Sequence, residues 1–532
     1  MSQRVNDIAR LIEQKAAERP DFPILTFVHV EPDGSLSDET RDFRSLWDRG
    51  QRLAAWLQAY GVKPGDSIIL MMTNRPQFVE AMVAAALAGA AFVPLDTRSM
   101  GDKLAYMINH VAAKAIIAED AALAALDAVA AQLDRRPPLL VVDSMRMPEH
   151  YAGSSYAADL PADAAGLAPQ IPDPAAPMYL MFTSGTTGNP KAVVRSHANY
   201  MRGMKGLRAL GVGAGDTLYT GLPLCHTNAH STLAAGLALE LPTVFSRQFT
   251  KSRLWDICRA YDCTMFTLLG GMIPEVFAVP PQPGDRDNPV RLVIASGMPA
   301  KLWEAYETRF GVQVTEVYGS TENGGTLINR MGEGPRGSMG KPPPGMIAAI
   351  LDDDDQICPP GEPGHLCFRK EDGASDAITY FRNEKASADK VVRGWFRSGD
   401  MAYADERGWF YFLHRAGGGI RRNGDFVNAT LVETVLAQCP AVADVYVYGV
   451  ATPANVAGER TLVAALVLEP GGSLDTVRQW AAERLQRSEV PEIWQLLAAI
   501  PKTVSEKPIE RDCAALLEAA GLVERAATEN RT

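Results

Sequence analysis

The sequence is poor in cysteine, and its cysteines show no paired spacing. Seven cysteines are scattered over 532 residues without a CxxC motif, and the eight histidines form no HExxH motif. A structural zinc site is therefore not expected. An odd and sparse set of cysteines also fits the reducing cytosol.

Long apolar runs and an excess of positive charge are absent as well. The longest apolar run, 81–95, contains Pro94 and is too short to span a bilayer, so we interpret it as a buried helix followed by a strand. The segment MSQRVNDIARLIEQK carries charges where a signal peptide needs an apolar stretch. The net charge of -11 argues against a nucleic-acid partner, which requires a basic surface. We expect a soluble, cytoplasmic protein without an integral membrane segment.

Strands and helices alternate along most of the chain. Helices are expected at 44–60 and 76–88, and buried strands at 67–72 and 91–95. This alternation predicts an α/β fold with parallel sheets covered by helices. The segment 144–176 is rich in Pro, Ala, Asp and Gly, and we expect it to form an exposed connection.

The chain is longer than one compact core usually allows, so more than one domain is expected. From about residue 335 short strands are punctuated by Gly and Pro, which predicts a β-rich subdomain. The run Ala-Gly-Gly-Gly at 416–419 is the best hinge candidate. We predict a large N-terminal domain of packed α/β sheets plus the β-rich subdomain (1–415), this hinge, and a small mobile α+β C-terminal domain (420–532).

A glycine-rich loop follows an apolar run in the segment 181–197, MFTSGTTGNPKAVVRSH. Small residues let backbone N–H groups converge on an anion while a lysine adds charge, so such a loop suits a phosphate group. The kinase-type pattern G-x-x-x-x-G-K-[ST] fails at two positions, because Pro190 replaces the second glycine and Ala192 replaces the hydroxyl that binds Mg²⁺. The loop is either a phosphate loop of another kind or a glycine-rich turn without a ligand.

The segment SGTTGNPK resembles the phosphate loop of the adenylate-forming (ANL) superfamily, which includes acyl-CoA synthetases, peptide-synthetase adenylation domains and luciferases. Further family motifs follow in order as far as residue 507, and GVKPGDSIILMMTNRPQFV resembles the opening strand and helix of the family. The resemblance implies that the β- and γ-phosphates of ATP are bound by Thr183, Ser184, Gly185, Thr186, Thr187, Gly188 and Lys191.

Three further segments resemble the family's nucleotide motifs. SGMP (296–299) and EVYGSTE (316–322) resemble the adenine-site segments, and GWFRSGD (394–400) resembles G-W-x-x-T-G-D. The resemblance implies that Glu322 holds Mg²⁺, a hard cation that prefers oxygen ligands, although a solvated turn residue is the alternative for it. It further implies an adenine site at Gly297, Tyr318, Gly319, Ser320 and Thr321, and a ribose site at Asp400 and Arg415.

The segment PLCH resembles the family's PLFH segment, in which the histidine lies by the acyl pocket and the ATP site. This implies a catalytic and acyl-pocket role for His226, although a lone histidine after an apolar strand is more often a core residue. The glycines near the expected pocket predict either room for a bulky acid or close backbone packing. They are Gly270, Gly271, Gly324 and Gly325. The stretches PLCHTNAHSTLAAGLAL and FTLLGGMIPEVF look nearest to the crotonobetaine/carnitine-type CoA ligases.

Near the C-terminal end, PKTVSEK resembles P-K-T-x-[ST]-G-K. The resemblance implies that Lys507 is catalytic and stabilises charge between the substrate carboxylate and the α-phosphate. The segment IRRNGDFVN resembles the family's CoA-side loop, which implies contacts with CoA from Arg421, Arg422 and Gly424, although adjacent arginines are usually surface residues. A hinge is implied at Gly417. The chain departs from the family pattern at His414, Gly417, Leu431 and Glu506.

The resemblance implies an acid–CoA ligase that uses ATP, Mg²⁺ and coenzyme A. A carboxylate attacks the α-phosphate of ATP to give an acyl-adenylate and pyrophosphate, and the acyl group then passes to the thiol of CoA with release of AMP. No carrier domain follows Lys507, which favours CoA as the acceptor. A stand-alone adenylating enzyme that loads a carrier protein and a non-catalytic ATP-binding relative stay open as alternatives. The sequence gives neither the acid nor the oligomeric state, and a homodimer stays open.

Overall fold

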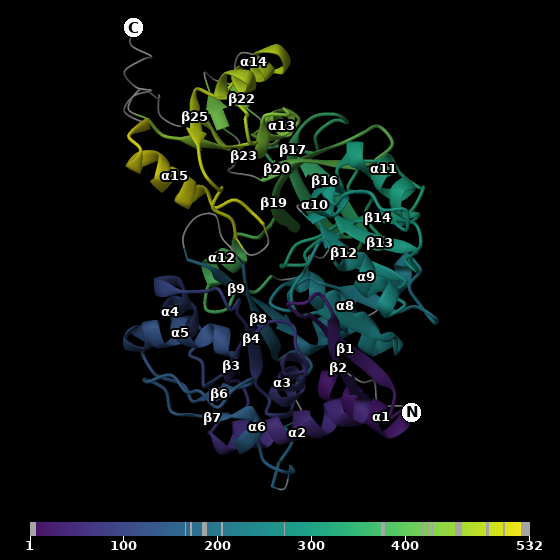
Figure 1. The fold of residues 1–532 in the computed structure, drawn as a ribbon, viewed down its shortest axis with the longest axis vertical. Coiled ribbons are helices and arrows are strands. Elements are labelled where there is room, and N and C mark those ends of the chain that lie inside the picture. Colours follow the sequence, from purple (N-terminus) through teal and green to yellow (C-terminus); the bar gives the residue numbers. More distant parts are fainter. Residues whose placement is uncertain are drawn as a thin grey trace. The chain divides into compact units, whose positions relative to one another are not determined.

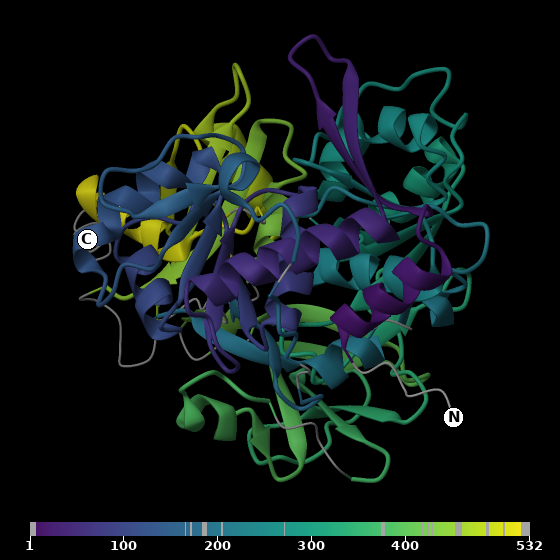
Figure 2. The ribbon, with the colours of Figure 1, turned by 90° about the horizontal axis from the view of Figure 1, so that it is seen from below.

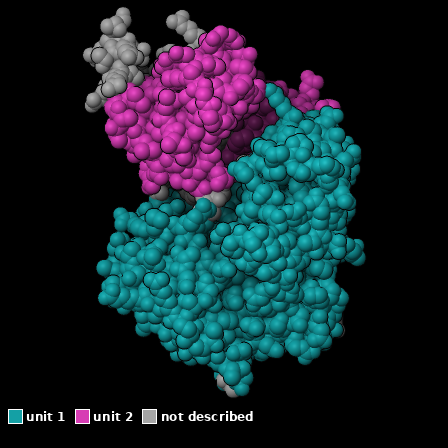
Figure 3. Space-filling model, in the orientation of Figure 1, with its two compact units in different colours: residues 1–337, 377–391 teal, residues 338–376, 392–532 magenta. Residues whose placement is uncertain are grey.

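The computed structural model of the chain divides into two compact units (Figure 3). Unit 1 comprises residues 1–337 and 377–391, and unit 2 comprises residues 338–376 and 392–532. The structure describes residues 7–164, 166–170, 173–183, 189–203, 206–270, 272–373, 378–415, 420–422, 425–427, 429–452, 460–485, 489–503 and 506–522. Within these ranges, only the backbone is described at residues 414, 415, 421, 422, 425, 426 and 431.

The first sheet of unit 1 has seven strands in the order β7-β6-β5-β3-β4-β8-β9 (Figure 1). All neighbours are parallel except β8 and β9. Both faces of its central strands are packed, since Ile68 and Ile69 belong to different buried clusters. The elements are α1 (Ile8–Glu18), α2 (Phe43–Ala59), β3 (Ser67–Met71), α3 (Pro76–Leu87), β4 (Ala91–Pro94), α4 (Gly101–His110), β5 (Ala115–Ala118), α5 (Asp120–Val129), β6 (Leu139–Val141), β7 (Gly153–Ser155), α6 (Tyr156–Asp159), β8 (Pro177–Thr183), β9 (Lys191–Ser196) and α7 (His197–Gly203).

The second sheet of unit 1 has eight strands in the order β15-β14-β13-β12-β10-β11-β1-β2. Strand β1 comes early in the chain but pairs in parallel with β11, and Figure 2 shows the purple β1–β2 hairpin extending from this sheet. The elements are β1 (Pro23–Val30), β2 (Leu36–Asp42), β10 (Leu218–Thr220), α8 (Thr227–Leu239), β11 (Thr243–Ser246), α9 (Leu254–Ala260), β12 (Met265–Leu269), α10 (Met272–Ala278), β13 (Leu292–Ser296), α11 (Ala300–Phe310), β14 (Gln313–Tyr318) and β15 (Leu327–Asn329).

The apolar run 81–95 forms the last turns of α3 and then β4, as predicted. The two elements are joined at Gly89, whose φ of 68° is the left-handed conformation that glycine adopts readily. Both α3 and β4 are buried. Helices α1 and α2 pack against α3, and β4 lies between β3 and β8 in the sheet. Within the residues that the structure describes, no helix has the length and apolar character needed to cross a membrane.

Unit 2 contains the predicted β-rich segment and the C-terminal α+β segment. A five-stranded sheet is formed by β16, β17, β18, β19 and β20, and a three-stranded sheet has the order β23-β24-β25. The elements are β16 (Met346–Leu351), β17 (Gly364–Lys370), β18 (Val391–Val392), β19 (Trp395–Ala404), β20 (Phe410–Arg415), β21 (Ile420–Arg422), β22 (Asp425–Val427), α13 (Ala429–Leu436), β23 (Val442–Val450), β24 (Thr461–Leu468), α14 (Leu474–Arg484), β25 (Ile493–Leu496) and α15 (Glu510–Ala519). The short helix α12 (Glu384–Ala388) belongs to unit 1.

A buried asparagine joins the two sheets of unit 1. Asn74 follows β3, and its Nδ2 donates to the backbone oxygens of Leu222 and Ser246, each at 2.9 Å. Its Oδ1 accepts a hydrogen bond from the N–H of Leu224 at 2.7 Å. Because Asn74 is only 1% exposed, this side chain replaces water for three backbone groups. It thereby fixes the segment that leads to the predicted pocket histidine, His226.

Replacing Asn74 with Ala should lower the free energy of unfolding by about 2–4 kcal/mol, because buried backbone groups would lose their hydrogen-bond partners. Denaturant unfolding followed by tryptophan fluorescence measures the change. Asn109→Ala is the matched control, since Asn109 bonds to the backbone of Gln132 and Asp134 at the surface. Equal stability of the two variants would contradict the role of Asn74.

Candidate active site

The predicted phosphate loop lies between two paired strands. Strands β8 and β9 form an antiparallel hairpin in which Thr183 is opposite Lys191. The Thr183 Oγ1 donates to the backbone oxygen of Lys191 at 3.3 Å, which closes the base of the loop. The remaining loop residues of the prediction, 184–188, lie outside the described part of the chain.

Tyr380 connects this hairpin to the predicted metal ligand. Its segment lies along β9, where the N–H of Val194 donates to Thr379 and the N–H of Phe381 donates to Ala192, each at 2.8 Å. The Lys191 Nζ lies 5.5 Å from the centre of the Tyr380 ring. On its other side, the Tyr380 hydroxyl donates to the Glu322 Oε1 at 2.7 Å. The loop lysine and the carboxylate therefore contact the same aromatic side chain.

The carboxyl of Glu322 is buried and held in its charged form. Burial alone would raise its pKa, but the Tyr380 hydroxyl and the Lys390 ammonium, 3.9 Å from Oε1, bring the pKa of Glu322 below its usual value. A buried carboxylate that is held in its ionised form suits a hard divalent cation, so the residues present fit Mg²⁺.

A second buried carboxylate holds the segment that contains Gly297. Glu316, on β14, accepts hydrogen bonds from the N–H groups of Gly297 at 2.5 Å and of Met298 at 2.9 Å. Burial raises the pKa of Glu316 to about 7, although both N–H groups oppose the shift. The two predicted adenine segments, 296–299 and 316–322, are thus tied together by one side chain.

Two glycines of this region meet through their backbones. A Cβ at Gly270 would lie 3.0 Å from the backbone oxygen of Gly297, and one at Gly297 would lie 3.3 Å from the Cα of Gly270. Of the two interpretations of Gly270, close backbone packing is therefore supported. Gly319 differs, because a Cβ there would meet no atom within 4 Å, so open space lies beside it. Gly324 is half-buried, and Gly271 lies outside the described residues.

The turn that carries Ser320 and Thr321 follows directly after β14. Tyr318 is the last residue of this strand and pairs with Leu327 of β15. The turn is closed by the N–H of Asn323, which donates to the backbone oxygen of Ser320 at 2.9 Å. Arg195 of β9 donates to the backbone oxygen of Thr321 at 3.2 Å, so the phosphate hairpin also contacts this turn.

The residues of the predicted ribose site lie opposite each other in unit 2. Asp400 of β19 is paired in register with Arg415 of β20. The Ser398 hydroxyl donates to the backbone oxygen of Leu366 at 2.7 Å and accepts from the N–H of Asp400 at 3.0 Å. Ser398 stands where the motif G-W-x-x-T-G-D has threonine. Its hydroxyl accepts the hydrogen bond that holds the backbone of Asp400.

The predicted catalytic lysine lies in a tight loop of unit 2. The N–H of Lys507 donates to the Thr503 hydroxyl at 3.2 Å, and the N–H of Thr503 donates to the backbone oxygen of Lys507 at 2.7 Å. Glu506 has a φ of 57°, the left-handed conformation that glycine adopts most readily. At the position where the resembling motif has glycine, this chain thus has a backbone conformation that favours glycine.

His226 lies at the N-terminal end of α8 in unit 1. It has an extended backbone (φ −124°) and is half-buried, next to Cys225 and near Asp96. Of the other predicted residues, Arg421 and Arg422 belong to β21, which pairs with β22, and their side chains are not described. The predicted hinge at Gly417 and the CoA-side residue Gly424 lie outside the described residues.

Sequence analysis did not find Tyr380, Lys390 and Asn74, or the role of Glu316. Each acts through a partner distant in the chain, and the separation is 58 residues between Tyr380 and Glu322. Glu316 opens the segment EVYGSTE and Asn74 lies in the segment 61–79, but neither motif reveals the partner of the side chain. The one available signal for Glu316 is a carboxylate inside a strand that ends just before the turn with Glu322.

Two family models match the chain. The AMP-binding enzyme model matches residues 12–375, and the AMP-binding enzyme C-terminal domain model matches residues 431–507. The medium/long-chain-fatty-acid–CoA ligase of Mycobacterium marinum is 32% identical over 454 residues, which cover 84% of this chain and 85% of that protein. The long-chain fatty acid transport protein 1 of Homo sapiens is 31% identical over 471 residues, or 81% of this chain and 71% of that protein.

Solved structures of CoA ligases share the fold. The anthranilate CoA ligase in complex with anthranoyl-AMP superposes with a TM-score of 0.81 at 21% identity, over 97% of this chain and 98% of that chain. The o-succinylbenzoate CoA synthetase of Bacillus subtilis with ATP and a magnesium ion gives a TM-score of 0.78 at 23% identity, over 95% and 99% of the two chains. The predicted α/β architecture with a smaller C-terminal part is confirmed.

Proposed function

The chain belongs to the AMP-binding enzyme family as an AMP-forming acyl-CoA synthetase, and we propose that its acid substrate is a medium- or long-chain fatty acid. It couples the ligation of an acid to CoA with the conversion of ATP to AMP and pyrophosphate. Relatives named as medium/long-chain-fatty-acid–CoA ligases support the proposed substrate. An acid of the crotonobetaine or carnitine type is the alternative.

The observation that carries the proposed residue roles is the contact of Lys191 and Glu322 with the same tyrosine, Tyr380. A cation and an ionised carboxylate placed this way suit the two sides of a Mg²⁺–triphosphate complex. In our proposal Lys191 and the 183–188 loop bind the β- and γ-phosphates, while Glu322 holds Mg²⁺. The metal, when bound, would withdraw negative charge from the phosphate oxygens.

The remaining roles concern the nucleoside and the acid. The backbone of 297–298 and 318–321 would bind the adenine, and the Asp400 carboxylate would accept hydrogen bonds from the ribose hydroxyls with the help of Arg415. His226 would line the acyl pocket. Lys507 would donate to the oxygen that joins the acid to the α-phosphorus, where negative charge is shared during attack. Arg421, Arg422 and Gly424 would bind CoA.

The nucleotide affinity should depend on pH through Glu316. Its pKa of about 7 lies above the usual 4.5, so its contribution to folding is largest below 4.5 and is lost as the pH rises through 7. The ionised form, however, accepts both N–H groups of the adenine segment. We expect the KM for ATP to rise about fivefold as the pH falls from 8 to 6, in steady-state assays with saturating acid and CoA.

The variant Glu316→Gln tests this explanation. Gly297 and Met298 donate to different oxygens of Glu316, and in Gln one of these is replaced by an NH2 group that cannot accept. The KM for ATP should therefore be raised and should no longer change around pH 7. Glu307→Gln is the control, because Glu307 also accepts a backbone N–H, that of Val314, but has no hydrogen bond to the N–H groups of Gly297 and Met298. A wild-type pH profile in Glu316→Gln would contradict the prediction.

We propose the domain boundary at 416–419, with the hinge at Gly417, between domains 1–415 and 420–532. Gly417→Pro fixes the backbone φ, so it should spare adenylate formation or thioester formation but not both. Pyrophosphate release and transfer of the acyl group from added acyl-adenylate measure the two steps separately. Equal loss of both steps would count against a hinge at this position.

A pyrophosphate-release screen over carboxylic acids of increasing chain length, with and without CoA, tests the proposed substrate. Medium- or long-chain acids should give the highest kcat/KM, with CoA-dependent formation of AMP. A preference for crotonobetaine or carnitine would overturn the fatty-acid proposal. Pyrophosphate exchange without CoA consumption would indicate a carrier-loading enzyme, and ATP binding without pyrophosphate release from any acid would indicate a non-catalytic relative.

We further propose that the enzyme acts in the cytoplasm as a homodimer. Fractionation of the producing cells and light scattering of the purified protein test the two statements. Recovery of the enzyme in the membrane fraction, or a monomer mass in solution, would contradict them.

A further inference from the structure

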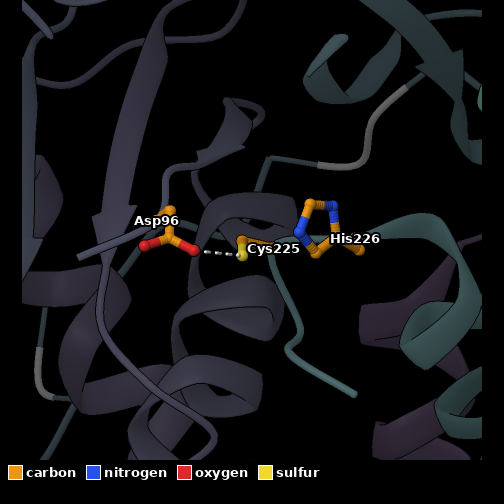
Figure 4. A group of neighbouring side chains, drawn as sticks. All are labelled: Asp96, Cys225 and His226. Atoms are coloured by element: carbon orange, nitrogen blue, oxygen red, sulfur yellow. Dashed lines mark hydrogen bonds between the residues drawn. The ribbon is translucent and has the colours of Figure 1, made fainter. Parts of the chain in front are cut away.

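Three side chains of types that bind metal ions meet in unit 1. Asp96 follows β4, and Cys225 and His226 precede α8, so the group joins the two sheets. One ligand atom of each residue lies within 4.8 Å of the others. Figure 4 shows the Cys225 sulfur between the Asp96 carboxylate and the His226 ring. Among the residues that the structure describes, this is the only such group of three.

The backbone around the group is fixed by buried contacts. Asn74 binds the backbone of Leu222 and Leu224, immediately before Cys225. After His226, the Thr227 hydroxyl lies 3.0 Å from the Met181 sulfur. The Cys225 Sγ donates to the Asp96 Oδ2 at 3.7 Å. The three ligand atoms are thus held near one another before any ion binds, which reduces the cost of assembling a site.

The donor set selects the class of ion. Sulfur, imidazole nitrogen and carboxylate oxygen are the ligands of Zn²⁺, whereas Mg²⁺ prefers oxygen ligands only. We propose that Asp96, Cys225 and His226 bind a divalent transition-metal ion of the Zn²⁺ type, separately from the Mg²⁺ that accompanies ATP. Three protein ligands leave a fourth position for water. Binding replaces the thiol proton, which passes to the solvent, with a metal–sulfur bond.

Two groups of one neighbouring residue, Arg98, affect how strongly the site binds a cation. The Arg98 backbone N–H donates to the Asp96 Oδ1 at 2.8 Å, and its guanidinium lies 3.4 Å from the same oxygen. A positive charge so close opposes a bound cation. Because the Arg98 side chain is mostly exposed, replacing it with Ala removes this charge with little loss of packing. Arg98→Ala should therefore strengthen metal binding, which is the opposite of the effect expected for removal of a ligand.

Occupation of the site should inhibit the enzyme. The bound ion would engage His226, which the proposed function places in the acyl pocket, so this consequence rests on that proposal. Mg²⁺ should not replace Zn²⁺ as an inhibitor, because it does not favour sulfur ligands.

Metal binding to the full-length protein without ATP, acid or CoA tests the proposal, since phosphates and the CoA thiol would themselves bind Zn²⁺. We expect one Zn²⁺ per chain by equilibrium dialysis, and a sulfur-to-metal charge-transfer band when Co²⁺ is the probe. Cys225→Ser should weaken Zn²⁺ binding by at least about tenfold and abolish the band. Cys358→Ser, which removes a cysteine of unit 2, should change neither. Unchanged Zn²⁺ affinity in Cys225→Ser, or no such band in the wild type, would overturn the site.

Acid-dependent pyrophosphate release with added Zn²⁺ separates this inference from the proposed function. Inhibition in the wild type and its absence in Cys225→Ser, each relative to its own metal-free rate, would support both. Metal binding without inhibition would overturn the acyl-pocket role of His226 and leave the metal site standing. Ligase activity without metal binding would overturn the site and leave the proposed function standing.

Discussion

Replacing Lys507 with Ala should lower the rate of acyl-adenylate formation by about a hundred- to a thousandfold, the usual effect of removing one preorganised charge-stabilising donor. Acid-dependent pyrophosphate release under single-turnover conditions measures this step. Transfer of the acyl group from added acyl-adenylate to CoA should be much less affected. The charge that Lys507 stabilises develops while the acyl-adenylate forms, and this step is bypassed when the acyl-adenylate is added.

Lys502→Ala provides the matched control for the loop. The Lys502 Nζ lies 2.7 Å from the Asp444 carboxylate and 3.9 Å from that of Glu506, so its loss disturbs the same loop without removing the catalytic ammonium. If the rate of adenylation falls equally in Lys502→Ala and Lys507→Ala, the loss is caused by a disturbed loop and not by the missing Lys507 charge. An unaffected rate in Lys507→Ala would remove the assignment.

Replacing Glu322 with Gln should lower the rate of adenylation about a hundredfold and raise the Mg²⁺ concentration needed for half-maximal rate. The amide keeps the volume and can still accept from Tyr380, but it lacks the negative charge that binds the metal and faces Lys390. A titration with Mg²⁺ at fixed ATP measures both effects.

Two further variants serve as comparisons for Glu322→Gln. Tyr380→Phe removes the hydroxyl that donates to Glu322 and should cause a smaller loss, about tenfold, because the carboxylate itself remains. Glu304→Gln changes a carboxylate that pairs with Arg336 at the surface and should have no effect. An unchanged Mg²⁺ requirement in Glu322→Gln would show that the metal is held elsewhere.

Several elements that the sequence predicted have an apolar pattern that arises from burial on both faces. The residues of β3 are all buried, and the same run of apolar letters marks the strand in the sequence. Strand β2 was missed because it lies at the edge of its sheet and is mostly exposed, so its residues show no apolar alternation. The segment expected to be an exposed connection contains β7 and α6, since its polar composition hid two short elements.

The candidate site could be predicted only as far as its motifs extend along the chain. Resemblance gave Lys191 and Glu322 as separate residues, but the tyrosine that contacts both comes from a segment without a motif. For Gly270 the sequence allowed two interpretations, and only the approach of its backbone to Gly297 distinguishes them. Packing between distant segments is a property of the fold and cannot be read from local patterns.

The attack of a carboxylate oxygen on the α-phosphorus of ATP is the central claim of this account. The most direct test uses the fatty acid labelled with ¹⁸O in its carboxylate, with CoA and ATP, followed by mass spectrometry of the products. One labelled oxygen should be found in AMP, because it joins the acyl group to the α-phosphorus and stays with phosphorus when the CoA thiol attacks the carbonyl carbon. Unlabelled AMP, or label in pyrophosphate or phosphate, would contradict the account.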